Sequence, residues 1–409
     1  MRKVLYTLLA AALLLTALSC TKGPAEEPLQ EAVVCADDGT AIRESALQSG
    51  RVRIFVSEET AREIEADPAA YAAGHAAEGI VSIERTFPDA GEFEARSRRY
   101  GLHRWYDVCL AEGLPLTKAG SSLKEIPGVE KTEYIPRLRK PAYIDVSWKY
   151  NSEARQQAWR ASSGSYIFDD PMLNRQWNLI NRGSSSSRSR AIRGCDVNIS
   201  RVWENCLPGS EDVIVAVVDG GIDFKHEDLC DNMWHNPDKS GTQAYGYNFI
   251  NDSYVISAES HGTHVAGIVA AAGNNGKGIS GIAGGNAAAG IAGVRLMSCQ
   301  IFKENSEDSG DDAKAIKWAA DHGAIICQNS WDYDDAAYMP SYAKNAVDYF
   351  NEVAGTDGEG KPTFYFKAAP QFEAPHDSPY AWLNDAIYVC QPEWDRQFKG
   401  IILNVWKVK

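Results

Sequence analysis

The sequence lacks the features that mark several large classes of protein. It carries 41 Lys and Arg against 55 Asp and Glu, a formal net charge of −14, so it has no basic excess of the kind that nucleic-acid-binding proteins show. Beyond residue 18 there is no long apolar run, which excludes a protein with several membrane spans. No short period repeats, which argues against a solenoid. The 44% hydrophobic and 23% charged residues are typical of a folded chain, and a length of 409 residues indicates more than one domain.

The N-terminus has the pattern of an export signal. Arg2 and Lys3 precede the apolar segment 4–18, which is short for a membrane-spanning helix. Cys20 follows at the expected cleavage point, and this placement resembles the lipobox of bacterial lipoproteins, in which such a cysteine is lipidated. We therefore predict an exported protein anchored at Cys20 to the membrane of the cell envelope or surface, with residues 21–45 as a polar tether. A plain cleaved signal with an incidental cysteine is the alternative.

The nine cysteines include no Cys-x-x-Cys pair, which argues against a zinc ribbon. Export permits disulfides, and Cys195 and Cys206 are close in sequence, although their spacing does not define a pairing. Cys299 and Cys327 lie in apolar, strand-like runs, where buried free thiols are the alternative.

Residues 46–137 alternate strand and helix patterns and are predicted to form one small domain. In chain order the patterns, beginning with a strand, cover residues 51–57, 58–66, 80–87, 92–100, 104–110, 116–126 and 129–135. The order β-α-β-(α)-β-α-β predicts a ferredoxin-like α+β fold. It contains no cluster of catalytic groups, so we expect it to bind another molecule. Residues 138–190, with two prolines and a run of four serines, predict a linker and a lead-in to the next domain.

Residues 191–366 are predicted to form an α/β domain. The β-branched run 213–218 is typical of a strand buried on both faces of a parallel sheet. The clearest elements after it are a strand, a helix and a strand at 294–302, 311–322 and 324–327. This order predicts a right-handed crossover between parallel strands. Sheets of this kind place functional sites at the carboxyl ends of their strands.

Two polar residues are expected at that edge. Asp219 ends the buried strand and is followed by two glycines, which let another backbone approach; a capping aspartate in a turn is the alternative. His261 begins a helix of small residues, 265–272, which can pass close to a sheet. A carboxylate facing that helix start would orient one ring nitrogen of His261 and leave the other as a general base. A zinc site formed by His261 and His264 is an alternative. The two histidines are three positions apart, however, whereas those of the zinc motif His-Glu-x-x-His are four apart, so we expect His264 to have a structural role in the helix start.

Two motifs resemble those of the subtilisin-like serine peptidases, the subtilases. AVVDGGID at 216–223 and HGTHVAGIVAA at 261–271 are similar to the family's Asp and His motifs. NRQW at 174–177 is similar to the segment that opens many mature domains of the family. The resemblance covers roughly residues 45–335.

The resemblance implies a fold, a reaction and roles for particular residues. The implied fold is a subtilisin-like parallel sheet with helices on both faces, incomplete at the C-terminus and preceded by a ferredoxin-like propeptide. The implied reaction is peptide-bond hydrolysis by an Asp/His/Ser triad, with Asp219 orienting and His261 acting as base. The implied partners are a protein or peptide substrate, the chain's own propeptide as chaperone and inhibitor, and the membrane through the lipid anchor, with no nucleic acid.

Further site residues follow from the same resemblance. Ser330 and Trp331 correspond to the edge strand that binds the substrate backbone, where a peptide adds as a strand; the usual glycine after them is Asp332 here. Gln176, Asp228 and Asn275 correspond to ligands of a structural calcium, the one cofactor expected, and their oxygens suit that ion. A simple Asn-Gly turn at 275–276 is the alternative.

The motif that would supply the nucleophile is missing. No Gly-Thr-Ser motif occurs after Asp332, and Ser378, the last serine, precedes a proline and lacks the glycine of a tight helix entrance. The oxyanion asparagine is also not found, because residues 367–371 read KAAPQ and a divergent tail, 367–409, follows. A frame change or truncation before the serine motif produces such a tail.

These losses predict an inactive chain. Loss of the nucleophile costs ~10⁴–10⁶ in rate, and loss of the oxyanion donor costs ~2.7–4 kcal/mol. We therefore expect a subtilase that does not turn over peptides as written. The alternative is a non-catalytic surface lipoprotein that binds peptides.

Overall fold

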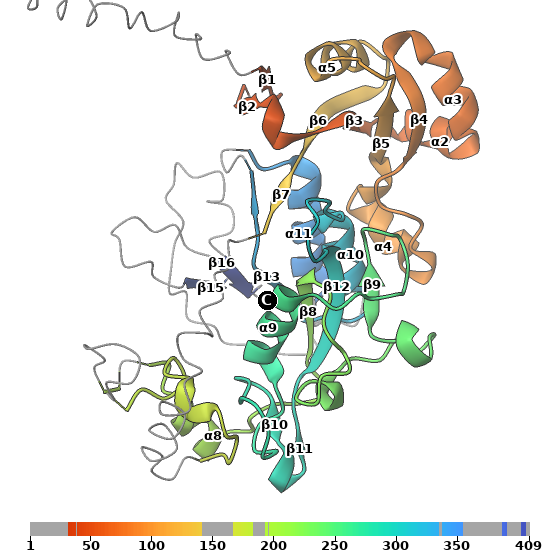
Figure 1. The fold of residues 1–409 in the computed structure, drawn as a ribbon. Helices are drawn as coiled ribbons and strands as arrows, with labels where there is room; N and C mark the ends of the chain where they lie inside the picture. Colours follow the sequence, from red (N-terminus) through yellow and green to blue (C-terminus); the bar gives the residue numbers. More distant parts are fainter. Residues whose placement is uncertain are drawn as a thin grey trace, which may run out of the picture.

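The computed structural model describes residues 32–37, 39–140, 167–182, 193–194, 196–334 and 338–354, together with the backbone of two paired strands, β15 (Ile387–Cys390) and β16 (Ile402–Val405) (Figure 1). The predicted lipidation site Cys20, the serine Ser378 and the rest of the predicted tail lie outside the described residues. Within the described part, no helix is both long and apolar enough to cross a membrane.

The N-terminal domain has the predicted ferredoxin-like fold. Its strands are β3 (Leu47–Val56), β4 (Ile80–Arg85), β5 (Trp105–Leu110) and β6 (Val129–Pro136). Its helices are α2 (Glu58–Ala66), α3 (Pro68–Gly74), α4 (Glu94–Arg99) and α5 (Leu116–Lys124). The strand order is β4-β5-β3-β6 and every neighbouring pair is antiparallel. Ser57 caps α2 by accepting a hydrogen bond from the backbone of Thr60, as its position before the helix predicts.

The predicted tether is wrong for residues 33–45. Strands β1 (Val33–Cys35) and β2 (Ala41–Arg43) form an antiparallel hairpin. Val34 and Ile42 are fully buried in the core of the N-terminal domain. Each strand offers a single buried residue between two exposed ones, which is too short a pattern to separate a strand from a polar tether.

The second domain is built on a parallel sheet with the order β13-β8-β12-β9. Its strands are β8 (Ile214–Gly220), β9 (Gly246–Asn248), β12 (Arg295–Phe302) and β13 (Ile326–Asn329). Its helices are α8 (Ile199–Asn205), α9 (Ser260–Ala270), α10 (Asp312–Asp321) and α11 (Ser341–Val353). Short antiparallel pairs join β10 (Gly285–Asn286) to β11 (Ile291–Ala292) and β7 (Leu138–Arg139) to β14 (Asp332–Tyr333).

Helices cover both faces of the parallel sheet, as predicted. Val215 and Val217 of β8 lie in one core with residues of α9. Ala216 and Val218, which point to the opposite face, lie in another core with residues of α10 and α11. The continuous apolar run of β8 thus reflects burial on both faces. The lead-in at 167–182 is also packed, since it forms a small core with α8 that includes Phe168 and Trp203, whose rings stack 4.5 Å apart.

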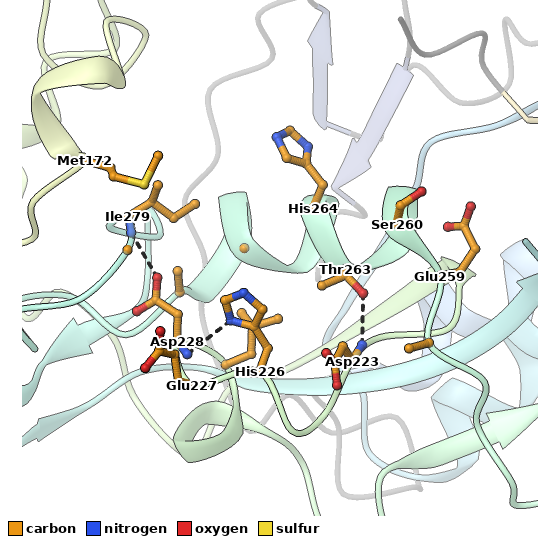
Figure 2. Close-up of a pocket in the computed structure, with 15 residues that line it drawn as sticks. Met172, Asp223, His226, Glu227, Asp228, Glu259, Ser260, Thr263, His264 and Ile279 are labelled. Carbon is orange, nitrogen blue, oxygen red and sulfur yellow. Dashed lines mark hydrogen bonds between the residues drawn. The ribbon is translucent and has the colours of Figure 1, made fainter. Parts of the chain in front are cut away.

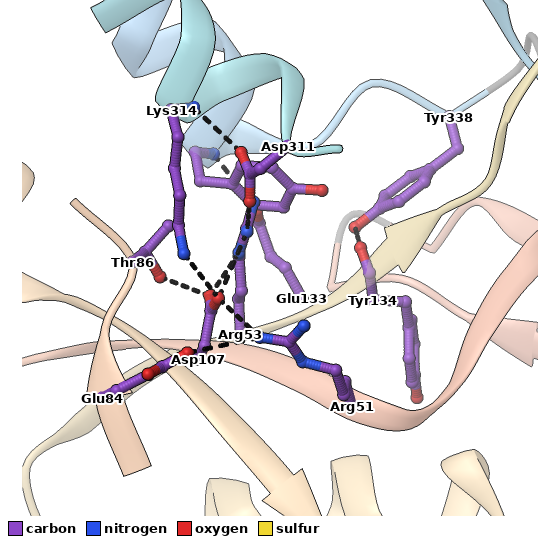
Figure 3. Close-up of polar contacts among 11 residues, drawn as sticks. Arg51, Arg53, Glu84, Thr86, Asp107, Glu133, Tyr134, Asp311, Lys314 and Tyr338 are labelled. Carbon is purple, nitrogen blue, oxygen red and sulfur yellow. Dashed lines mark hydrogen bonds and ion pairs between the residues drawn. The ribbon is translucent and has the colours of Figure 1, made fainter. Parts of the chain in front are cut away.

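The two domains share one apolar core. Trp105 of β5 and Leu102 pack with α10 and α11, and the Trp105 ring lies edge-on to that of Tyr342, 5.9 Å between centroids. Polar groups cross the same interface, because Arg53 of β3 is paired both with Asp107 of its own domain and with Asp311, the N-cap of α10 (Figure 3). The N-terminal domain is therefore docked on these helices by a buried apolar and charged surface.

Candidate active site

Asp219 lies where the sequence predicts, at the carboxyl end of the central strand β8. It is fully buried, and its Oδ1 accepts a hydrogen bond of 2.6 Å from the backbone N–H of Gly220. Both neighbours of β8 are parallel strands, so Asp219 sits at the edge where the strand ends of the whole sheet meet. A buried carboxylate needs a partner for its charge, and that partner comes from α9.

His261 is the second residue of α9, and its Nδ1 lies 2.7 Å from Asp219 Oδ1. The predicted meeting of the two side chains is therefore present. Because Nδ1 is used by this hydrogen bond, exchange of a proton with a ligand falls to Nε2. A carboxylate that fixes the ring in this way selects the tautomer that a general base requires.

Glycines permit this approach of helix to strand. A Cβ added to Gly262 would lie 2.0 Å from the carbonyl oxygen of Gly220, and one added to Gly220 would lie 2.0 Å from the carboxylate of Glu259. Both distances are far inside van der Waals contact. The glycines beside the two functional residues are thus required by the close packing of α9 against the end of β8.

The surroundings raise the pKa of both Asp219 and His261. Burial raises the pKa of Asp219, although the hydrogen bond from His261 acts in the opposite direction. Burial lowers the pKa of His261, but the hydrogen bond and charge of Asp219 outweigh it, and the net shift is upward. A histidine pKa raised on folding stabilises the fold below the ordinary histidine pKa, and this contribution is lost as the pH rises through the raised value. The same shift makes His261 a better proton acceptor.

Glu259 belongs to the site but was not found from the sequence. It is the N-cap of α9, and its Oε2 accepts a hydrogen bond of 2.9 Å from the backbone N–H of Gly262. Its Oε1 forms an ion pair with Nζ of Lys140, which follows β7. Glu259, Asp219 and His261 offer ligand atoms within 4.8 Å of one another, but these contacts already use both oxygens of Glu259 and Nδ1 of His261. The position of the acidic Glu259 before the helix could have indicated an N-cap. No pattern in the sequence indicates that Lys140 is its partner.

Ser330 and Trp331 follow β13, whose last residue, Asn329, lies opposite Val218 at the strand end that carries Asp219. Ser330 is buried and its hydroxyl accepts a hydrogen bond from Gln328, while the indole N–H of Trp331 donates to the carbonyl of Val218, 3.0 Å away. The bond from Trp331 ties this segment to β8, and the next two residues, Asp332–Tyr333, pair with an extended segment. The segment is β7 of the chain itself, which forms a separate two-stranded antiparallel sheet with β14.

The three residues predicted to bind calcium meet at one loop, 274–280, and Figure 2 shows one of them, Asp228, bonded to Ile279 of this loop. Asp228 accepts hydrogen bonds of 2.9 Å from the side-chain amide of Asn275 and from the backbone N–H of Ile279. Gln176 contacts Ser280 of the same loop through both of its amide atoms. The structure therefore brings the predicted residues to one loop, with the Asn275 amide nitrogen facing the carboxylate.

A cavity of about 660 Å³ lies along the flank of α9, between it and this loop. Glu259 and His264 are among its lining residues, whereas Asp219 and His261 are not. Figure 2 shows His264 pointing away from Asp228 and His226. Among the described residues, His264 does not belong to the group of side chains, Asp219, Glu259 and His261, that are close enough to share a metal ion.

Comparisons with known proteins point to one family. Residues 210–369 match the subtilase family model, and residues 60–183 match the model for the N-terminal part of the subtilase family. The halolysin-like extracellular serine protease Nep of Natrialba magadii is 37% identical over 194 residues, covering 45% of this chain and 33% of Nep. Kexin of Saccharomyces cerevisiae is 31% identical over 172 residues, covering 42% of this chain and 18% of kexin.

The fold comparison agrees. The crystal structure of fervidolysin from Fervidobacterium pennivorans, a keratinolytic enzyme related to subtilisin, aligns with a TM-score of 0.50 over 79% of this chain and 40% of fervidolysin, at 20% identity. The matches thus cover a third or less of the length of Nep and kexin. Because two models of one family match successive parts of the chain, and its parallel sheet carries the Asp and His motifs at one edge, this chain belongs to the subtilase family.

Proposed function

We propose that this chain carries the peptide-binding edge and the general-base pair of a subtilisin-like serine endopeptidase. The observation that carries the proposal is the 2.7 Å hydrogen bond between Asp219 and His261, next to the edge on which β7 is added as a strand. Asp219 holds the imidazole and stabilises its protonated form, and His261 accepts the proton of an attacking nucleophile through Nε2. Backbone hydrogen bonds to Asp332–Tyr333 hold the peptide, as they hold β7.

The proposal extends to an absence of turnover. No Gly-Thr-Ser motif follows Asp332 in the sequence, and residues 367–371 do not supply the expected asparagine. A base without its nucleophile loses orders of magnitude in rate, ~10⁴–10⁶ in a triad enzyme. We therefore propose that the chain with this sequence binds peptides without hydrolysing them.

A second candidate is a surface lipoprotein whose function is peptide binding itself. It is favoured by the pairing of an extended segment, β7, with Asp332–Tyr333 and by the lipobox-like Cys20. Export is supported by the signal pattern and by the extracellular relative Nep. Reading the genomic DNA beyond codon 366 in all frames distinguishes the candidates, since a Gly-Thr-Ser motif in a shifted frame favours a damaged enzyme.

The absence of turnover is directly testable. We expect a fluorophosphonate, which reacts with activated serine nucleophiles, to leave the purified full-length chain unlabelled, and a fluorogenic peptide to stay intact. An active subtilase in a parallel reaction controls for probe quality. Covalent labelling mapped by mass spectrometry to any serine of this chain would refute the proposed loss of the nucleophile.

We also propose that the loop 274–280 binds a structural calcium through Asp228, Asn275 and Gln176. Its support is their convergence on one loop and the preference of calcium for carboxylate and amide oxygens. Calcium at about 100 times its dissociation constant should then stabilise the fold by about 2.7 kcal/mol relative to chelator, measured by chemical denaturation. Asp228→Asn should remove this dependence on calcium. An equal stability of the original chain in calcium and in chelator contradicts the proposal.

A further inference from the structure

The segment that follows the N-terminal domain enters the candidate active site as a bound peptide would. Leu138 pairs with Tyr333, and Arg139 pairs with Asp332, so β7 runs antiparallel along the strand edge. The ammonium of the next residue, Lys140, forms an ion pair with Glu259. Glu259 lies two residues before His261 in the sequence. In the direction of the chain, the segment therefore runs from the paired edge toward the catalytic pair.

Glu259 is suited to recognise a cation. Its side chain is 1% exposed, whereas that of Lys140 is 28% exposed. One carboxylate oxygen caps α9 and the other faces Lys140. A buried carboxylate that loses its cationic partner bears an uncompensated desolvation cost, so an apolar residue in the place of Lys140 leaves Glu259 unsatisfied.

Two further observations place the ammonium close to the reacting groups. Burial and the positive charge of Lys140 both lower the pKa of His261, against the larger rise that the hydrogen bond and charge of Asp219 cause. Glu304, whose pKa is lowered chiefly by the backbone hydrogen bond from Ser260 and in part by Lys140, adds a second negative charge nearby. By contrast, Arg139 and Asp332 lie 3.5 Å apart with 62% and 47% of their side chains exposed. An exposed ion pair of this kind contributes little free energy to the docking of the segment.

We propose that Glu259 is a specificity-determining residue that selects peptides with Lys or Arg at the position of Lys140. This inference rests on the proposed peptide-binding function and names the substrate class of that site. The chain's own segment thus occupies the site with the side chain that the site recognises.

The test uses the full-length chain with its segment released. Lys140→Glu places a second negative charge against Glu259, which undocks the segment and opens the edge. Lys140→Met is the second variant, since it removes the ion pair without adding a repulsion. Fluorescent peptides with the sequence of residues 135–140, carrying either the final Lys or Met in its place, are titrated by fluorescence anisotropy. A third peptide, with Arg139→Met, is the matched control on the peptide.

We expect the Lys peptide to bind about 10- to 100-fold more tightly than the Met peptide, the range for a hydrogen bond to a buried charge. The Arg139→Met peptide should bind within about fivefold of the Lys peptide. Adding Glu259→Gln, which keeps an oxygen to cap α9, should remove the preference for Lys, whereas Glu304→Gln should retain it. Thermal unfolding of each variant confirms that it is folded.

The outcomes separate this inference from the function on which it rests. Equal binding of the Lys and Met peptides to either folded variant overturns the role of Glu259 and leaves peptide binding intact. A preference for Lys that persists in Glu259→Gln also overturns it. Binding of none of the peptides to either folded variant contradicts the proposed peptide-binding function itself.

Discussion

Replacing Arg53 with methionine is expected to lower the free energy of unfolding by about 3–5 kcal/mol. Arg53 is 2% exposed and pairs with Asp107, at 2.6 Å from Nε, and with Asp311 on the opposite domain. Its guanidinium also lies 4.0 Å from the centre of the Tyr342 ring. The substitution keeps most of the apolar stem but leaves the buried carboxylate of Asp107 with much less compensating charge.

The control for this prediction is Arg51→Met on the same strand. Arg51 also contacts Asp107, at 3.0 Å, but 38% of its side chain is exposed (Figure 3). We expect a loss below about 1 kcal/mol, as for other exposed pairs. Urea denaturation of both variants measures the difference. Similar losses for Arg53→Met and Arg51→Met would show that burial of the Arg53 cluster does not hold the domains together.

The stability that the same cluster contributes depends on pH. Burial raises the pKa of Asp107, but the charges of Arg53 and Lys314 outweigh it and hold this pKa well below the usual carboxyl range. A carboxyl whose pKa falls on folding stabilises the protein above its ordinary pKa, and this contribution is lost as the pH falls through the lowered value. The docked N-terminal domain should therefore loosen in strong acid.

Gly262→Ala is expected to cost about 3 kcal/mol and to separate Asp219 from His261. The added Cβ would meet three backbone atoms of Gly220, the nearest at 2.0 Å. Backbone cannot rotate away as a side chain can, so α9 must move off the end of β8. Loss of the 2.7 Å hydrogen bond then lowers the pKa of His261 from its raised value, which an NMR titration of the imidazole detects.

Gly267→Ala in the same helix is the matched control. Its added Cβ would lie 3.4 Å from the Cδ1 of Ile279, at the limit of ordinary contact and against a flexible side-chain end. Alanine also favours a helix over glycine by about 1 kcal/mol. We expect unchanged or slightly higher stability and an unchanged His261 titration. A Gly262→Ala chain with normal stability and the same His261 pKa as the original would disprove the proposed close approach.

Local sequence patterns predicted much of the fold. The run at 213–218 identified a strand buried on both faces because every residue in it is apolar, and Val217 and Val218 lie in two different cores. The sequence allowed either Asp311 or Asp312 to cap α10, and the structure has Asp311 as the N-cap, where it accepts a hydrogen bond from the backbone of Lys314. The pattern failed at 33–45, where each short strand contributes one buried side chain and packing, not periodicity, decides the structure.

For the site, the sequence by itself determined which residue types end the central strand and begin the small-residue helix, since strand burial and helix capping act over a few neighbouring residues. Only the tertiary structure decided which charges meet. Lys140 lies 119 positions from Glu259, and Arg53 lies 258 positions from Asp311. The pairing of such distant charges depends on where two domains dock and how much water they exclude, and no local pattern of residues carries that information.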